Sequence, residues 1–206
     1  MSVPSIEQNN IQSYNNIANQ FSDKRFKPWD WIDKFITSKS EGSDILDIGC
    51  GNGRNMEYSN YNFTGVDNCK EFISICTNKN LNAIECDMTS LPFETNSFDS
   101  IISIASFHHL ANHDRRELAV KEMSRVLKND GNILLSVWSK DQSHNKKLNF
   151  TYGDNYVPWK NKDGTIKEMR YYYIFQDTEL EALLQKYFTI YSKRWIHGND
   201  VYILHK

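Results

Sequence analysis

The sequence predicts an α/β fold in which helices cover both faces of a mostly parallel sheet. From Ser43 to Trp138, short apolar segments with the length of buried strands alternate with helical segments, which is the rhythm of a parallel sheet. The first of these strands runs into the glycine-rich stretch Gly49-Cys50-Gly51-Asn52-Gly53. A glycine loop after a strand is typical of doubly wound folds that bind a ligand at the carboxyl end of that strand.

The N-terminal 42 residues have helical periodicity. Apolar residues recur at helical spacing from Ile11 to Phe21, and again from Trp29 to Ile36 after Pro28. We therefore expect residues 1–42 to form an N-terminal helical cap.

Strands and helices then alternate along the chain. Each expected strand is a short apolar run bounded by turn residues. The strands are expected at Asp44–Ile48, Phe63–Asp67, Asn82–Cys86, Phe98–Ala105 and Gly131–Trp138. The helices are expected near Asn55, where the glycine loop would open a helix, and over Lys70–Asn78 and Asp114–Leu127.

The last part of the chain changes character. Thr178–Lys186 is expected to be a helix, and two apolar segments, Phe188–Trp195 and Val201–His205, flank the turn sequence Gly198-Asn199-Asp200. These two segments should form an antiparallel hairpin. The sheet would then have seven strands, one of them antiparallel and close to the C-terminus.

A long insertion, residues 139–176, separates these two parts and is rich in lysine, asparagine, tyrosine and tryptophan. Its aromatic content argues against disorder. We expect it to form one wall or lid of the acceptor site, although an aromatic satellite cluster over the sheet explains the same composition equally well.

Composition limits the possible classes of protein. A chain of 206 residues with 39% hydrophobic content is expected to form a single domain over 1–206. With a net charge of -2, any nucleic-acid site must be a local basic patch. The four cysteines form no Cys-x-x-Cys pair, so no metal site is expected. Without an apolar run of membrane length or a signal-like start, we expect no membrane insertion and a cytoplasmic, possibly also nuclear, location.

The charge beside the glycine loop distinguishes possible cofactors. Asp47 ends the first strand, two residues before the first glycine. A carboxylate there would repel the pyrophosphate of a dinucleotide. It would attract the α-ammonium and sulfonium groups of S-adenosylmethionine. The sequence therefore favours S-adenosylmethionine over NAD(P), with a glycine turn that serves no ligand as the remaining alternative.

Two more acidic residues end neighbouring strands. Asp67 lies where doubly wound folds place a carboxylate on the ribose hydroxyls. Asp87 and Met88 follow the third strand, where they would contact the amino group and the ring of an adenine. Taken singly, each acid is more often a helix cap or a solvated loop residue. Three of them at successive strand ends indicate a nucleoside pocket.

This series of residues resembles the class I S-adenosylmethionine-dependent methyltransferases, which have a Rossmann-like fold. The resemblance covers residues 43–137 and indicates the cofactor but not the acceptor. The cofactor-binding residues that it implies are Tyr14, Asp47, Gly49, Cys50, Gly51, Asn52, Gly53, Asp67, Asn68, Asp87, Met88 and Ile104.

Three further segments narrow the resemblance. They are Tyr14 to Trp29, Ser103 to Leu110 followed by Arg115-Arg116-Glu117, and Val157-Pro158-Trp159 leading to Arg170-Tyr171-Tyr172. Together they resemble the eukaryotic tRNA wobble-uridine carboxymethyl methyltransferases, in their stand-alone fungal form and in the methyltransferase domain of animal proteins that also carry a dioxygenase. The chain departs from the family pattern at Gln20, Lys24, Leu110 and Tyr173.

The resemblance implies methylation of the carboxylate of 5-carboxymethyluridine in tRNA anticodons. Arg25 is expected to pair with that carboxylate, and His108 or His109 to donate a hydrogen bond to it or to the base, with Tyr14 and Arg170 as second choices. A surface ion pair for Arg25, and a helix cap or a packed imidazole for the histidines, are the alternatives. The expected substrate-binding residues are Lys24, Arg25, Lys27, Arg115, Arg116, Trp138, Trp159, Arg170 and Tyr171. Further candidates for phosphate contacts are Lys146, Lys147, Lys160, Lys162 and Lys167.

The resemblance also implies two partners. One is tRNA, and the other is a small zinc-binding activator protein that would pair with the open edge strand at Leu81 to Cys86. Three other functions fit parts of the sequence. They are a small-molecule methyltransferase, a non-catalytic RNA-binding subunit that keeps S-adenosylmethionine for stability, and an NAD-linked enzyme.

Overall fold

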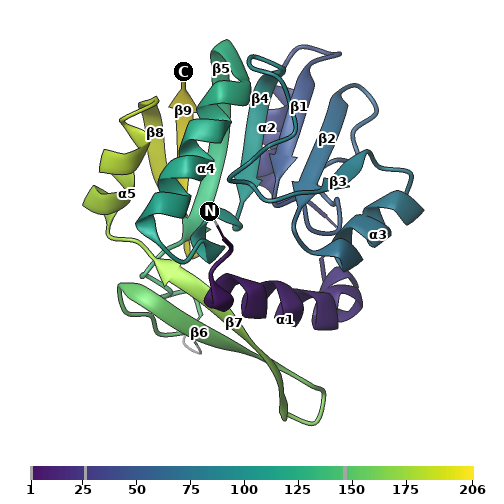
Figure 1. Ribbon diagram of the computed structural model, residues 1–206, viewed down its shortest axis with the longest axis vertical. Helices are drawn as coiled ribbons and strands as arrows, with labels where there is room; N and C mark the ends of the chain where they lie inside the picture. Colours follow the sequence, from purple (N-terminus) through teal and green to yellow (C-terminus); the bar gives the residue numbers. More distant parts are fainter. Residues whose placement is uncertain (1, 26, 146–147) are drawn as a thin grey trace.

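The computed structural model describes residues 2–25, 27–145 and 148–206, and its centre is a seven-stranded sheet (Figure 1). The strand order is β3-β2-β1-β4-β5-β9-β8. The pairs from β3 to β5 are parallel, and β9 is antiparallel to both β5 and β8. This confirms the predicted sheet. The strands are β1 (Asp44–Ile48), β2 (Asn62–Asp67), β3 (Ala83–Glu85), β4 (Phe98–Ile104), β5 (Leu127–Trp138), β8 (Thr189–Ile196) and β9 (Asn199–His205).

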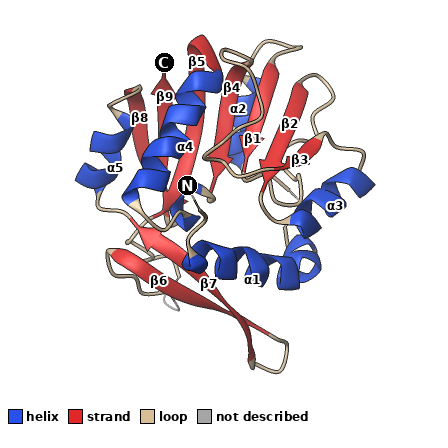
Figure 2. Cartoon of the chain, viewed as in Figure 1, coloured by secondary structure: helices blue, strands red, loops and turns tan. Residues whose placement is uncertain are grey.

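Helices cover both faces of the sheet (Figure 2). Ile32 of α2 packs with Ile45 of β1 on one face, and Val120 of α4 packs with Leu46 on the other. Neighbouring residues of β1 reach opposite faces because side chains alternate along a strand. The helices are α1 (Ser5–Ser22), α2 (Asp30–Thr37), α3 (Lys70–Asn78), α4 (His113–Val126), α5 (Asp177–Leu184) and the short 3₁₀ helix η1 (Phe107–His109). In the described ranges, no helix combines the length and apolarity needed to cross a bilayer.

Helix α1 lies across the carboxyl ends of the parallel strands (Figure 1), and much of its buried face is polar. Glu7, Asn10 and Ser13 are buried there, and each is hydrogen-bonded to a residue outside the helix. Near its C-terminal end the helix instead buries the apolar residues Ile17 and Ala18. The N-terminal segment therefore covers the end of the sheet at which a ligand of an α/β fold binds.

The helix expected near Asn55 is absent from the described structure, and that prediction is wrong. Turns follow β1 instead. Gly49, Gly51 and Gly53 all have positive φ, which a right-handed helix does not accommodate. Met56 then turns inward and is buried against β2.

The insertion contains a two-stranded antiparallel ribbon that the sequence analysis did not predict. Its strands are β6 (Gly153–Lys160) and β7 (Ile166–Ile174), which lie beside α1 below the sheet (Figure 1). Along β6, Tyr156 and Pro158 are exposed while Val157 and Trp159 are buried. The ribbon contributes to a small apolar cluster and also lines the cavity described next, while its role in an acceptor site stays a prediction.

Candidate functional site

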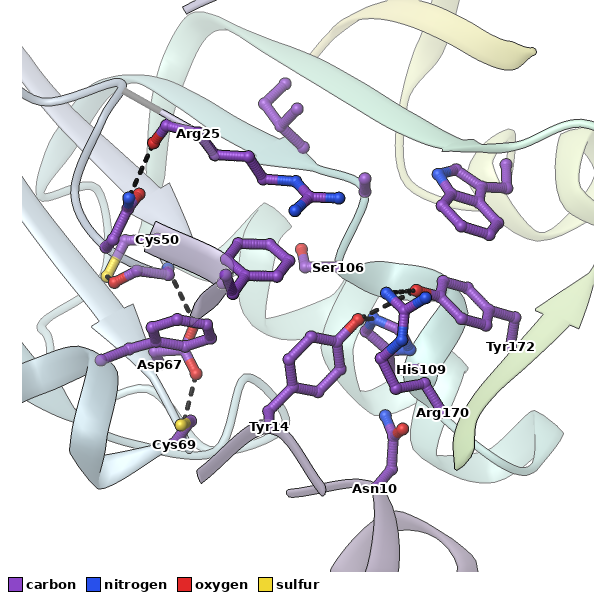
Figure 3. Close-up of a pocket in the computed structure, with 18 of the residues that line it drawn as sticks. Asn10, Tyr14, Arg25, Cys50, Asp67, Cys69, Ser106, His109, Arg170 and Tyr172 are labelled. Carbon is purple, nitrogen blue, oxygen red and sulfur yellow. Dashed lines mark hydrogen bonds between the residues drawn. The ribbon is translucent and has the colours of Figure 1, made fainter. Parts of the chain in front are cut away.

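A cavity of about 310 Å³ lies at the carboxyl edge of the sheet, and α1 lines one side of it. The glycine loop, α1, the loop after β4, the insertion and the turn before β9 all contribute to its lining (Figure 3). The predicted cofactor residues in the lining are Tyr14, Gly49, Cys50, Gly51, Asn52, Asp67, Asn68, Met88 and Ile104. The sequence therefore identified one side of the cavity well.

The glycine loop packs too closely for side chains at two positions. A Cβ atom at Gly49 would lie 2.2 Å from the Cβ of Ser106, and one at Gly53 would lie 2.4 Å from Cδ1 of Leu81. Gly53 has this packing role and lies outside the cavity lining. Ser106 has little freedom to move, because its hydroxyl donates to the carbonyl of Ile48 at 2.8 Å.

Replacing Gly49 by alanine is expected to lower the free energy of unfolding by about 2–4 kcal/mol, from backbone strain at φ +76° and the clash with Ser106. Gly42→Ala is the matched control. Gly42 has φ +80° but open space around it, so it should lose only the backbone contribution, about 1–2 kcal/mol. Urea denaturation of both variants measures the difference. If both variants lost the same free energy of unfolding, Ser106 and the loop after β4 would move away from the new methyl group without cost.

Asp67 connects the glycine loop to β2. One carboxylate oxygen accepts the backbone N–H of Gly51 and the other accepts the N–H of Cys69, both at 2.9 Å (Figure 3). Burial raises the pKa of Asp67 to about 6. The carboxylate lines the cavity at the end of β2, the position predicted for ribose recognition.

Asp47 lies below the loop and outside the cavity lining. Both of its oxygens are fully buried, and neither has a hydrogen-bond partner among the described residues. Burial, with repulsion from Asp67 as a smaller contribution, raises the pKa of Asp47 to about 7. Because Asp47 lies outside the cavity lining, its carboxylate would act on a ligand through its charge, and its direct contact with the cofactor stays a prediction.

Asp87 and Arg115 belong to a buried ion-pair cluster outside the cavity lining. Arg115 is only 2% exposed and contacts Glu7 at 2.8 Å and Asp87 at 2.6 Å. Burial alone would raise the pKa of Asp87, but hydrogen bonds from Arg115 and Thr89 lower it. Asp87 therefore lies outside the cavity lining, while its neighbour Met88 lines it, and the contact of Asp87 with an adenine stays a prediction.

The prediction that Arg115 and Arg116 bind tRNA phosphates is wrong. Arg116 is 3% exposed and donates to the carbonyl groups of Leu110 and Ala111. Both arginines lie on α4, which packs on the sheet. Their guanidinium groups are used in folding and are not available to an external anion.

Four side chains on another wall of the cavity form one hydrogen-bonded chain (Figure 3). The Nδ1–H of His109 donates to the carbonyl of Tyr171 at 2.7 Å. Burial lowers the pKa of His109 to about 4, so the ring is neutral and its Nε2 accepts from the hydroxyl of Tyr14 at 3.1 Å. The oxygen of Tyr14 accepts from Tyr172 at 3.0 Å, whose oxygen in turn accepts from Arg170 at 2.7 Å. This assignment fixes which atom donates and which atom accepts in each of these hydrogen bonds.

His108 does not share this role with His109. It is fully buried outside the cavity lining, and its Nδ1 accepts the backbone N–H of Trp138 at 2.9 Å. Burial lowers the pKa of His108 well below its ordinary value. The structure therefore supports the packed-imidazole alternative for His108, which positions Trp138. The Trp138 ring lines the cavity and stacks on Tyr172 with ring centroids 4.1 Å apart.

Three arginines line the cavity and form no salt bridge among the described residues: Arg25, Arg54 and Arg170. Arg25 lies with its guanidinium carbon 4.0 Å from the ring centroid of Phe21. Arg170 is 5% exposed and its Nε–H is buried without a partner in the described part of the chain. Among the described residues, Arg25 does not form the surface ion pair that was considered for it.

The remaining predicted substrate residues lie outside the cavity lining. Lys24 and Lys27 are exposed, and Trp159 is buried beneath Lys24. Tyr171 is buried and donates to Asp154. Lys160 and Lys162 are exposed near the tip of the ribbon, with Lys167 half-buried beside them. Lys146 and Lys147 lie outside the described residues.

Sequence reasoning missed several lining residues, above all Arg54 and Tyr172. The alternation of side chains along β7 could have identified Tyr172, because Arg170 and Tyr172 share one face of the strand and Tyr171 takes the other. Arg54 directly follows the glycine loop in the sequence, but this place in the sequence does not show that its guanidinium forms no salt bridge among the described residues.

Comparison with known proteins identifies the family. A family model described as a methyltransferase domain matches residues 46–135. The tRNA (carboxymethyluridine(34)-5-O)-methyltransferase of Schizosaccharomyces pombe is 35% identical over 195 residues, which cover 84% of this chain and 85% of that protein. The chain belongs to this methyltransferase family. A Xenopus tropicalis relative named tRNA (carboxymethyluridine(34)-5-O)-methyltransferase alkbh8 is 29% identical and matches 94% of this chain, which spans only 40% of that longer protein.

Solved structures share the fold of this methyltransferase. Several are named as S-adenosylmethionine-dependent methyltransferases. A putative methyltransferase in a complex with the Haloferax volcanii Trm112 methyltransferase activator superposes with a TM-score of 0.68, at 14% identity, over 98% of this chain and 97% of that chain. The predicted Rossmann-like methyltransferase fold is thereby confirmed.

The residues of the cavity fit S-adenosylmethionine, the cofactor of this class of methyltransferase. The close-packed glycine loop leaves its backbone open to a ligand, and the buried carboxylate of Asp47, which forms no salt bridge among the described residues, favours a cation. Asp67 and Met88 both line the cavity, where the carboxylate would suit ribose hydroxyls and the apolar side chain would suit a base. The prediction of this cofactor from the sequence is confirmed at the level of the family. In the described part of the chain, no group of three or more His, Cys, Asp or Glu side chains is arranged to hold a metal ion.

Proposed function

We propose that this chain transfers a methyl group from S-adenosylmethionine to the carboxylate of 5-carboxymethyluridine at position 34 of tRNA. One observation carries the proposal beyond family membership. Arg25 and Arg170 line the cavity without an acidic partner among the described residues. Two such cations next to a methyl-donor site favour an acceptor that carries a negative charge.

A carboxylate acceptor needs no general base. Its pKa is about 4, so it is ionised at neutral pH. The proton assignment agrees with this requirement, because Nε2 of His109 already accepts the proton of Tyr14 and is not available to remove one from a substrate. The hydrogen-bonded chain from Arg170 to His109 therefore orients the arginine instead of moving protons.

Bound S-adenosylmethionine would supply the electrophilic methyl group. The task of the protein is to hold the acceptor oxygen in line with that methyl and to exclude water. Because the negative charge of the acceptor is lost during transfer, an anchor that held it too tightly would slow the reaction. Guanidinium groups that stack on aromatic rings, as Arg25 does on Phe21, orient the anion without enclosing it.

The affinity for S-adenosylmethionine is expected to rise as the pH increases through about 7. Asp47 binds its proton more tightly in the fold than in the unfolded chain, because its pKa is raised to about 7. The proton therefore stabilises the ligand-free fold fully below about pH 4, and this stabilisation is lost as the pH rises to about 7. The ionised form then attracts the cationic donor. Calorimetric titrations between pH 5.5 and 8 measure the trend. Asp47→Asn serves as the reference, because the amino group of S-adenosylmethionine itself titrates equally with both proteins. If the affinity of the variant rises with pH as much as that of the unaltered chain, Asp47 is not the cause.

Mass spectrometry of tRNA nucleosides tests the proposed reaction directly. tRNA that contains 5-carboxymethyluridine is incubated with the chain, S-adenosylmethionine and the activator described below. The methyl ester should appear with time. If the acid persists while the chain binds the cofactor, the acceptor assignment is wrong.

The proposal includes a small zinc-binding activator protein. The Trm112 complex of the Haloferax volcanii neighbour supports this, and so does the open edge of β3, where Ile84 is 39% exposed. An edge strand with an exposed apolar side chain is suited to pairing with a partner strand. Co-expression should improve solubility and cofactor binding. Equal solubility and activity of the chain alone would remove this part of the proposal.

A further inference from the structure

Lys24 is one of the residues at which this chain departs from the family pattern, and the structure gives its side chain a defined position. Its Nζ lies 4.9 Å from the ring centroid of Trp159. That ring is fixed, because Trp159 is only 8% exposed and its indole N–H donates to Oε1 of Gln20 at 3.1 Å. Gln20 is a second departure from the pattern. The exposed ammonium group of Lys24 therefore lies against a rigid aromatic surface.

Trp159 also brings two further cations close to Lys24. The guanidinium carbons of Arg170 and Arg25 lie 5.2 and 5.8 Å from the same ring centroid. In the described part of the chain, none of these three cations forms a salt bridge. Three positive charges therefore surround one ring.

The acidic residues of the adjoining segments do not pair with these charges. Glu168, on the strand that carries Arg170, accepts hydrogen bonds from Ser13 and Asn16 of α1. Asp23 precedes Lys24 in the sequence and is exposed, but within the described ranges it forms no salt bridge. Because like charges repel one another, this cluster favours a ligand with more than one negative charge.

The three cations differ in where they lie. Arg25 and Arg170 line the cavity (Figure 3), where they can hold the carboxylate of the proposed acceptor. Lys24 lies outside the lining and is open to solvent, so it is suited to an anion that is joined to the acceptor but remains outside the cavity. A compact ammonium group suits a phosphate as a point charge, whereas the paired donors of a guanidinium match a carboxylate.

The chemistry of a nucleotide indicates which phosphate this is. In a uridine nucleotide with the usual anti conformation, the substituent at C5 and the 5′-phosphate lie on the same side of the nucleotide. The 3′-phosphate leaves from the opposite end of the sugar. A carboxylate on C5 and the 5′-phosphate therefore form a pair of neighbouring anions, as the cluster around Trp159 requires.

We propose that Lys24, held over Trp159, binds the 5′-phosphate of the acceptor nucleotide. The inference rests on the proposed function, because it assigns Arg25 and Arg170 to the acceptor carboxylate. It adds that the chain recognises its acceptor as a nucleotide within an RNA strand and discriminates against the free nucleoside. The phosphate is remote from the reacting atoms, so the contact contributes to RNA binding and not to the maximal rate.

A neutral methylphosphonate linkage tests this contact in an anticodon stem-loop RNA that contains 5-carboxymethyluridine. Single-turnover methyl transfer, with the activator present, gives the half-saturating RNA concentration and the maximal rate separately. In the unaltered chain, a neutral linkage on the 5′ side of the acceptor should raise the half-saturating concentration about tenfold and change the maximal rate by no more than about twofold. Lys24→Gln should show the same rise with normal RNA and no further rise with the neutral linkage. Lys24→Arg keeps the charge and should remain sensitive to the linkage.

Lys27→Gln is the matched control, because Lys27 is an exposed lysine of the same segment. This variant should keep the full response to the neutral 5′ linkage. Three results would overturn the proposal: a full response in Lys24→Gln, a loss of the response in Lys27→Gln instead, or no response in the unaltered chain. Loss of sensitivity to a neutral 3′ linkage in Lys24→Gln would also contradict it, because Lys24 would then bind the other phosphate.

Failure of the proposed function gives a different result. If the normal stem-loop gains no methyl ester while the chain binds S-adenosylmethionine, the acceptor assignment is wrong, and the role of Lys24 is withdrawn with it. If the ester forms but its formation does not depend on the charge of the 5′ linkage, only the role of Lys24 is wrong.

Discussion

Replacing Arg25 by alanine is expected to slow methyl transfer to tRNA by roughly 100-fold, while the Kd for S-adenosylmethionine changes by no more than about twofold. Arg25 is a cavity cation without an acidic partner among the described residues, and its guanidinium is held against Phe21. Burial lowers the pKa of Arg25, but an arginine remains charged at neutral pH. Its loss removes an orienting charge from the acceptor and none of the loop contacts.

Single-turnover rates with tRNA in excess, and calorimetry with the cofactor, separate the two effects. Arg194→Ala is the control, because Arg194 is an exposed arginine on β8. It should retain both properties. Equal losses of transfer rate and cofactor affinity in Arg25→Ala would instead assign Arg25 to the cofactor.

Replacing Arg115 by methionine is expected to lower the free energy of unfolding by about 3–5 kcal/mol. The substitution keeps the volume of the side chain but leaves Glu7 and Asp87 without the cation between them. Glu7 is almost fully buried, so its charge would have no compensation. Urea denaturation measures the loss.

Two variants make this test specific. Lys186→Met breaks the solvent-exposed pair between Lys186 and Glu117, and should leave the free energy of unfolding almost unchanged. Adding Glu7→Gln to Arg115→Met removes one of the uncompensated charges and should recover part of the stability. A double variant no more stable than the single one would mean that packing, not charge, explains the loss.

The sheet could be predicted from the sequence because its signals are local. Each buried strand is a short apolar run, Asp47 is the last residue but one of β1, and Asp67 ends β2. The helix near Asn55 was predicted because a glycine loop usually opens one. Here the positive φ angles continue to Gly53, and Met56 then enters the core instead of beginning a helical turn.

The predicted site was less complete, because burial depends on contacts between distant segments. Arg115 looks like a surface cation in the sequence, and only the docking of α1, which carries Glu7, shows that it is buried. Tyr171 and Tyr172 are neighbours in a run of aromatic residues, and the register of β7 against β6 decides which one faces the cavity. Neither fact is contained in residue type or spacing.

The polar attachment of α1 has a consequence for how the helix is held. Removing Arg115 by mutation leaves a buried charge in place, but lifting the N-terminal half of the helix would hydrate Glu7, Asn10 and Ser13, and water can replace each lost hydrogen bond. The fully buried apolar residues of the helix, Ile17 and Ala18, lie towards its other end. The two ends of α1 are therefore attached differently: water could satisfy the polar groups of the N-terminal half if that half opened, whereas Ile17 and Ala18 hold the other end by apolar contact.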